Sequence, residues 1–183
     1  GDKYKYPALY DRTTNDVLDM TEGDSSGGWI VGDIDDNRGH VRIYKNVNNN
    51  WTQVGKDING EVVGDLSGNA VSLSADGSVV AIGALNNNDN GDNSGHVRVY
   101  KNVNNNWIKV WGDIDGENAG DNSGKSVSLS ADGSVVAIGA DGNDDNGYLS
   151  GHVRIYKNEN NEWNQVGNDI DGEAASDNSG WSV

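Results

Sequence analysis

The sequence contains no cysteine and no phenylalanine, and it has a single proline and a single methionine. Without cysteine, neither disulfide bonds nor thiolate metal sites are available. Long apolar runs are also missing, so no segment has the length of a membrane-spanning helix or a signal-peptide core. Cationic residues are scarce: 13 Lys and Arg stand against 29 Asp and Glu, which gives a net charge of −16. This charge argues against a nucleic-acid partner, and we expect no membrane insertion.

The sequence is dominated by a repeat with a period of 56 residues. His40, His96 and His152 are 56 positions apart, and the run VSLSADGSVVAIGA occurs unchanged at residues 71–84 and 127–140. A fixed period of this length indicates tandem copies of one supersecondary unit.

Each unit is predicted to contain four short strands. In the central copy these are the runs at 71–74, 78–84, 96–101 and 107–114, which are rich in β-branched and aromatic residues and are separated by turn formers. Ala-Asp-Gly at 75–77 predicts a tight hairpin, because Asp-Gly supplies the positive φ angles of such turns. No helical period is present, so we expect a four-stranded antiparallel meander.

The predicted strands carry apolar residues on both faces, so each sheet needs a neighbour on either side, as in a β-propeller blade. A β-sandwich of unrelated hairpins is the alternative, but it does not explain a constant period. We therefore predict an all-β fold of tandem four-stranded antiparallel propeller-type blades, roughly three in this chain. The predicted parts are a divergent N-terminal arm or first strand (1–26), blade 1 with a divergent start (27–63), blade 2 (64–119), blade 3 (120–175) and the first strand of an incomplete further blade (176–183).

The motif order G-x-SVSLSADGSVVAIGA at 124–140, followed by SGHVRIY at 150–156, resembles the FG-GAP repeat of integrin-α-type β-propellers. The similarity covers the chain from about residue 64 to its end, and more loosely from about residue 17. It implies a non-enzymatic structural or adhesion module, and the acidic, cysteine-free composition rich in Gly, Asn and Asp is typical of extracellular proteins at the cell surface. A carbohydrate-binding, lectin-like propeller that uses the Trp and Asp side chains of the loops is the alternative. The calcium loop of that family lies between the first two strands, where this sequence has only a short turn, so that metal site is not carried over.

A different group of acidic residues predicts a cation site. In a meander, alternate connections share one edge, so the loops at 85–94, 115–124, 141–150 and 171–180 form an acidic rim suited to hard cations or a basic protein partner. Within it, Asp141, Asn143 and Asp145 have the alternating oxygen-ligand spacing of calcium loops. They lack the glycine and the distal glutamate of an EF-hand, and an acidic surface that only keeps the protein soluble is the alternative. Ca²⁺ is the cofactor candidate.

The repeated His-Val-Arg triplets suggest architecture rather than catalysis, because a catalytic centre normally needs one asymmetric arrangement. We expect no catalytic residues and hence no enzyme. The arginines of the triplets are predicted to pair with acids at strand ends, and the recurring tryptophans to pack between blades or to stack on sugars. The residues concerned are Arg42, Arg98 and Arg154, Asp57, Asp113 and Asp169, and Trp51, Trp107 and Trp163. Asn50 begins an N-glycosylation sequon that matters only in a eukaryotic secretory context.

The two ends of the repeat array predict self-association. Trp181, Ser182 and Val183 match the start of a first strand, and Trp29, Ile30 and Val31 occupy the divergent amino-terminal unit. Open sheet ends of this kind pair with other chains. We expect a head-to-tail filament or a longer repeat array, ahead of a closed dimer, with glycans as further candidate partners.

Overall fold

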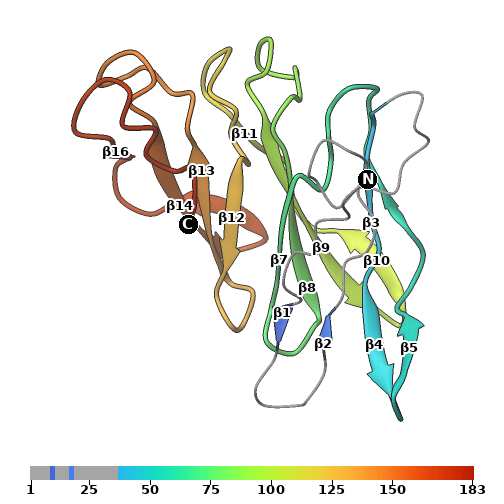
Figure 1. The fold of residues 1–183 in the computed structure, drawn as a ribbon. Helices are drawn as coiled ribbons and strands as arrows, with labels where there is room; N and C mark the ends of the chain where they lie inside the picture. Colours follow the sequence, from blue (N-terminus) through green and yellow to red (C-terminus); the bar gives the residue numbers. More distant parts are fainter. Residues whose placement is uncertain (1–8, 11–16, 19–36) are drawn as a thin grey trace.

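The computed structural model describes residues 9–10, 17–18 and 37–183, and this part of the chain consists of short antiparallel strands joined by turns (Figure 1). The described residues contain no helix, and therefore none that could cross a membrane. The prediction of an all-β fold with antiparallel pairing is confirmed. Trp29, Ile30 and Val31 lie outside the described residues, as does most of the predicted arm at 1–26.

The middle sheet contains the strands of one 56-residue unit. β8 (Val79–Ala84) pairs with both β7 (Ala70–Leu73) and β9 (His96–Val103), and β9 pairs in turn with β10 (Asn106–Lys109) and with β11 (Ile114–Asp115). The predicted hairpin turn joins β7 to β8. In it, the Asp76 carboxylate accepts hydrogen bonds from Ser74 Oγ and the Ser78 N–H, and Gly77 has a φ of 70°.

The following unit repeats this topology strand for strand. Its strands are β12 (Ser126–Leu129), β13 (Val135–Ala140), β14 (His152–Glu159), β15 (Glu162–Gln165) and β16 (Ile170–Asp171), with β16 paired to β14. The unit before the middle sheet is divided into two small sheets. There β3 (His40–Val41) pairs with β6 (Ile58–Asn59), and β4 (Tyr44–Val47) pairs with β5 (Asn50–Gln53). At the amino end, β1 (Leu9–Tyr10) pairs with β2 (Val17–Leu18).

The hydrophobic core lies between consecutive sheets, because the middle sheet is covered on both faces (Figure 1). Val80 and Ile82 of β8 face the preceding unit and pack with Val41, Ile43 and Ile58. The alternate residues of the same strand face the following unit, and they pack in a cluster of Val79, Ala81, Val97, Val99, Ile114, Val127, Val136, Ile138 and Tyr156. Successive side chains of β8 thus point alternately into two hydrophobic cores, which explains why the strand is apolar at nearly every position.

Close packing of neighbouring backbones requires glycine in the second strand of the middle and last units. A Cβ at Gly83 would collide with the carbonyl oxygen of Gly124, and a Cβ at Gly139 would collide with that of Gly180. Any larger residue at these positions would push consecutive sheets apart.

The predicted fourth strand at 107–114 is wrong in one respect, because the structure divides it into β10 and β11. The chain bends between them at Trp111, which has a φ of 64°. The equivalent positions in the other units are Gly55 and Gly167, with φ angles of 76° and 75°. A strand cannot continue through this left-handed conformation.

Two of the recurring tryptophans pack at the junctions between units. Trp107 contacts the preceding core cluster and donates from Nε1 to the carbonyl oxygen of Val54 at 2.7 Å. Gly55 permits this approach, since a Cβ there would lie 2.8 Å from Trp107 Cδ1. At the next junction Trp111 replaces the glycine, and its ring meets that of Trp163 edge-on at 5.3 Å. Trp163 Nε1 is buried and has no hydrogen-bond partner there.

Candidate cation site at a repeat junction

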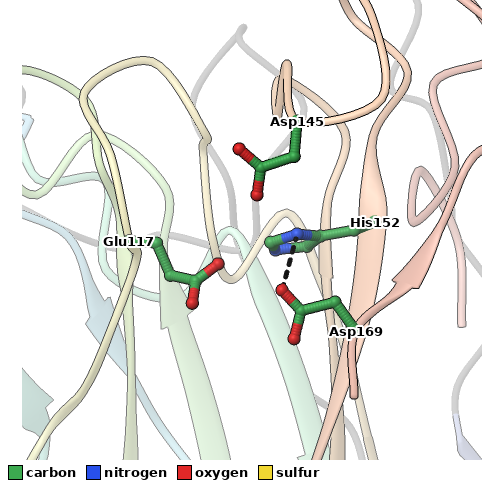
Figure 2. A group of neighbouring side chains, drawn as sticks. All are labelled: Glu117, Asp145, His152 and Asp169. Atoms are coloured by element: carbon green, nitrogen blue, oxygen red, sulfur yellow. Dashed lines mark ion pairs between the residues drawn. The ribbon is translucent and has the colours of Figure 1, made fainter.

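Four ligand-type side chains meet where the last unit joins the middle one (Figure 2). Glu117 follows β11 and belongs to the middle unit, whereas the other three residues belong to the last unit. Asp145 lies in the loop between β13 and β14, His152 is the first residue of β14, and Asp169 immediately precedes β16. One ligand atom of each residue lies within 4.8 Å of the ligand atoms of the other three.

Backbone pairing and Asx hydrogen bonds hold these residues in place. Because β16 pairs with the start of β14, the segment that carries Asp169 lies beside His152. The side-chain oxygen of Asn143 accepts a hydrogen bond from the Asp145 N–H at 3.0 Å, which fixes the turn of the β13–β14 loop. The N–H of Gly116 donates to the carbonyl oxygen of Gly95 at 2.8 Å and anchors the segment that carries Glu117.

His152 is the central residue of this group. Its side chain is fully buried, and neither ring nitrogen has a hydrogen-bond partner. Nδ1 lies 3.6 Å from Asp169 Oδ2, the contact drawn as a dashed line in Figure 2. Burial lowers the pKa of His152 below its usual value, and the nearby Arg154 lowers it further. The ring is therefore neutral at pH 7, which is the form that binds metal ions.

The charge around His152 is negative. Glu117, Asp145 and Asp169 contribute three carboxylates, and Arg154 contributes one guanidinium whose Nη1 lies 3.5 Å from Glu117. Burial raises the pKa of Glu117, although Arg154 opposes that shift. Three negative charges and one positive charge leave an excess of two negative charges, which a divalent cation would neutralise.

The structure separates the three residues of the predicted calcium loop. Asp145 belongs to the group around His152. Asp141 belongs to no group of three or more histidine and acidic ligands among the described residues, and burial raises its pKa. Asn143 is fully buried, and its Nδ2 donates to Asp121 Oδ1 at 3.3 Å. The site formed by all three loop residues stays a prediction.

The predicted arginine–aspartate pairs are present in two of the three units. Arg42 Nη2 lies 2.9 Å from Asp57, and Arg98 Nε lies 3.2 Å from Asp113. Arg154 instead donates to the carbonyl oxygen of Asp115 at 2.8 Å. This prediction is therefore wrong for the last unit, where Asp169 contacts His152. Sequence reasoning noted the histidines but interpreted them as architectural, and it assigned Asp169 to the arginine.

The remaining predicted residues lie apart from this group. Asn50 is exposed at the start of β5. Trp181 is 62% exposed with Lys125 Nζ 4.0 Å from its ring centre, and the exposed Ser182 and Val183 follow it outside any strand. The glycosylation and assembly roles of these residues stay predictions, as do a glycan or basic partner and a cell-surface location.

A groove of about 640 Å³ at the other junction contains none of the four residues around His152. It is lined by residues of the first and middle units: Lys56, Asp57, Ile58, Asn59, Tyr100, Val103, Asn104, Asn106, Trp107 and Ile108.

Comparison with known proteins gives a likeness in structure alone. No family model matches the chain, and no curated protein matches it. A Bacteroides uniformis protein assigned as a 6-phosphogluconolactonase matches with a TM-score of 0.50 and 12% identity, over 89% of this chain and 40% of that chain. The periplasmic gluconolactonase of Pseudomonas aeruginosa matches with a TM-score of 0.46 and 13% identity, over 83% and 37%. The chain thus spans about 40% of the length of the solved structures it resembles.

These findings correct several predictions. The resemblance to FG-GAP repeats of integrin-α-type proteins is wrong, because no family model matches and the solved structure with a TM-score of 0.50 is named as a 6-phosphogluconolactonase. The predictions of a non-enzymatic structural or adhesion module, with a filament or a lectin-like propeller, are corrected with it, because the solved structure that the chain resembles is named as a lactonase and not as an adhesion or lectin protein. The physical reason is that the motif consists of strand and turn positions that any antiparallel four-stranded repeat needs. At 12% identity the likeness shows the fold alone.

Proposed function

We propose that this chain forms part of a β-propeller hydrolase, that its units at 27–63, 64–119 and 120–175 are blades, and that a divalent cation bound at the His152 group serves its reaction. The substrate class is a sugar lactone, in line with the names of the solved structures that it resembles. The single observation that carries the proposal is the buried, unpartnered imidazole of His152 among three carboxylates.

The ligand chemistry supports an oxygen-preferring cation that also accepts one imidazole. Carboxylates suit Ca²⁺ and Mn²⁺, and the neutral imidazole of His152 adds one nitrogen ligand. Leaving both ring nitrogens without partners costs folding free energy, and a bound cation would remove part of this cost. A second buried side chain, Arg154, has its Nη1 3.5 Å from Glu117 and can bind an anionic group of a substrate.

A divalent cation would assist lactone hydrolysis in two ways. When held by Glu117, Asp145, His152 and Asp169, it would polarise the carbonyl oxygen of the ester and would lower the pKa of a bound water molecule. Glu117 and Asp145 are exposed members of the group, so a substrate can approach the cation from their side.

The test is hydrolysis of δ-gluconolactone, followed by proton release and corrected for the spontaneous reaction. We expect a rate above the spontaneous one with Ca²⁺ or Mn²⁺, loss of that rate with EDTA, and a large decrease in the His152→Asn and Asp169→Asn variants. Glu162→Gln is the matched control, because Glu162 is an exposed acid of β15 outside the group. A rate equal to the spontaneous one in the cation-loaded protein would contradict the hydrolase. Absence of cation binding by calorimetry would contradict the site itself.

A further inference from the structure

We infer that a second divalent cation binds at the preceding junction, between the first and middle units. This inference rests on the cation site of the proposed function and not on its hydrolase activity. The residues of the second site precede those of the first by 56 positions, and they are Glu61, Asp89, His96 and Asp113.

The structure brings these residues together in two overlapping groups. The carboxylate oxygens of Glu61, Asp89 and Asp113 lie within 4.8 Å of one another, and Asp89 forms a second such group with His96 and Asp115. Asp89 belongs to both groups and therefore connects the histidine to the other acids. The arrangement repeats the one at the later junction, with one glutamate from the preceding unit and the other ligands from the following unit.

The buried imidazole of His96 points to a ligand independently of the acidic residues. His96 is 1% exposed, and its Nδ1 has no hydrogen-bond partner. This nitrogen lies 3.8 Å from Asp89 Oδ2, too far for a hydrogen bond. Burial of an unsatisfied ring nitrogen is costly, and a cation between the imidazole and the carboxylate would satisfy both groups.

The second site differs from the first in its local positive charge. Arg98 pairs with Glu61 and Asp113, and Lys109 Nζ lies 2.9 Å from Asp113. The equivalent carboxylates of the second site (Glu61, Asp89 and Asp113) therefore face two cationic side chains, whereas those of the His152 group face one. A cation must also compete with Arg98 for Glu61 and Asp113. We therefore expect the second site to bind the same ion on the order of tenfold more weakly, which corresponds to about 1.4 kcal/mol.

Each cation would connect two consecutive units. Glu61 lies in the segment after β6, whereas Asp89, His96 and Asp113 belong to the middle unit. Because the cation binds only when the two units are docked, its binding free energy adds to the stability of the folded junction.

Isothermal titration calorimetry of the whole chain, freed of metal with EDTA and titrated with MnCl₂ or CaCl₂, tests this inference. The matched variants are Glu61→Gln and Glu117→Gln, since both side chains are partly exposed, at 51% and 38%, and each pairs with a buried arginine, so that the two changes remove the same charge in equivalent places. Glu162→Gln is again the control. We expect two sites in the wild-type protein and in the control. Glu117→Gln should weaken the tighter site by about tenfold or more, and Glu61→Gln should weaken the other site alone.

The outcomes separate this inference from the proposed function. A single site that is lost in Glu117→Gln and unchanged in Glu61→Gln would overturn the second site and leave the first intact. Weak binding that is identical in all four proteins would be non-specific and would overturn both sites. Two sites with the expected selectivity, in a protein that does not hydrolyse lactones, would support the inference and contradict the hydrolase.

Discussion

Replacement of Trp111 by glycine is expected to stabilise the protein, although it removes a large aromatic side chain. Trp111 holds a φ of 64° at a position where the other two units have glycine. A left-handed conformation at a residue with a side chain costs about 1–3 kcal/mol. The buried Nε1 of Trp163 also lacks a partner, whereas the equivalent Trp107 donates to Val54. We expect Trp111→Gly to let Trp163 approach and donate to the carbonyl oxygen of Val110, which contributes about 1–3 kcal/mol.

The losses are smaller than these gains. The edge-on pair of Trp111 with Trp163 contributes about 0.5–1.5 kcal/mol. The half-buried indole contributes about 1 kcal/mol through its apolar contacts, and the greater freedom of glycine in the unfolded chain costs about 0.5–1 kcal/mol. The gains therefore sum to about 4 kcal/mol and the losses to about 3 kcal/mol, so the net stabilisation is about 1 kcal/mol.

Trp111→Ala is the control that isolates the backbone effect. It removes the same indole but keeps the strained φ, and its Cβ still obstructs Trp163, as a Cβ at Gly55 would obstruct Trp107. Urea unfolding followed by far-UV circular dichroism gives the free energy of unfolding of each protein. We expect the free energy of unfolding of Trp111→Gly to exceed that of Trp111→Ala by about 2 kcal/mol or more, although replacing glycine by alanine usually stabilises a protein. The Trp163 indole N–H should also become protected from solvent exchange in Trp111→Gly. An alanine variant as stable as the glycine variant would refute the reasoning.

Two further outcomes are expected. Gly139→Ala should lower the free energy of unfolding by about 2–4 kcal/mol, because its Cβ would collide with the Gly180 backbone. Gly112→Ala is the control and should change the free energy of unfolding by less than about 0.5 kcal/mol, because the space around Gly112 is open. Chemical denaturation of both variants checks this prediction, and equal effects would contradict it. Stability should also fall as the pH drops below about 6.5, because burial lowers the pKa of His40 in the folded state and the unfolded state then binds more protons. His40→Asn should reduce this slope between pH 7.5 and 5.5, and an unchanged slope would argue against the assignment.

The strand content could be predicted from the sequence because it depends on local patterns. The alternation in the second strand and the Asp-Gly turn can be read from a single copy, and the period of 56 residues follows from comparing the copies. The break between β10 and β11 was missed because tryptophan is not a turn signal, and only comparison with Gly55 and Gly167 shows that Trp111 occupies a left-handed position.

The candidate cation site could be predicted only in part, because its residues come from two units. Asp145 was identified from the ligand spacing within its loop. Glu117 and Asp169 are 52 positions apart and meet only through the docking of consecutive sheets. Side-chain packing buries His152 and lets Arg154 donate to the carbonyl oxygen of Asp115 instead of pairing with Asp169. The His-Val-Arg triplet is identical in all three copies, so the sequence does not reveal either feature.

The two identical hairpins, β7–β8 and β12–β13, affect how the chain folds. Either hairpin carries the residues that pair with β9 or with β14, since the runs at 71–84 and 127–140 are the same. During refolding, β14 can therefore pair with the hairpin of the neighbouring unit and leave its own hairpin unpaired. Such non-native pairings are compact and must unfold before the correct sheet forms, so they act as kinetic traps. Refolding from denaturant should accordingly show a slow phase that is not catalysed by prolyl isomerase and that disappears when one of the two hairpins is given a different sequence of equal strand propensity.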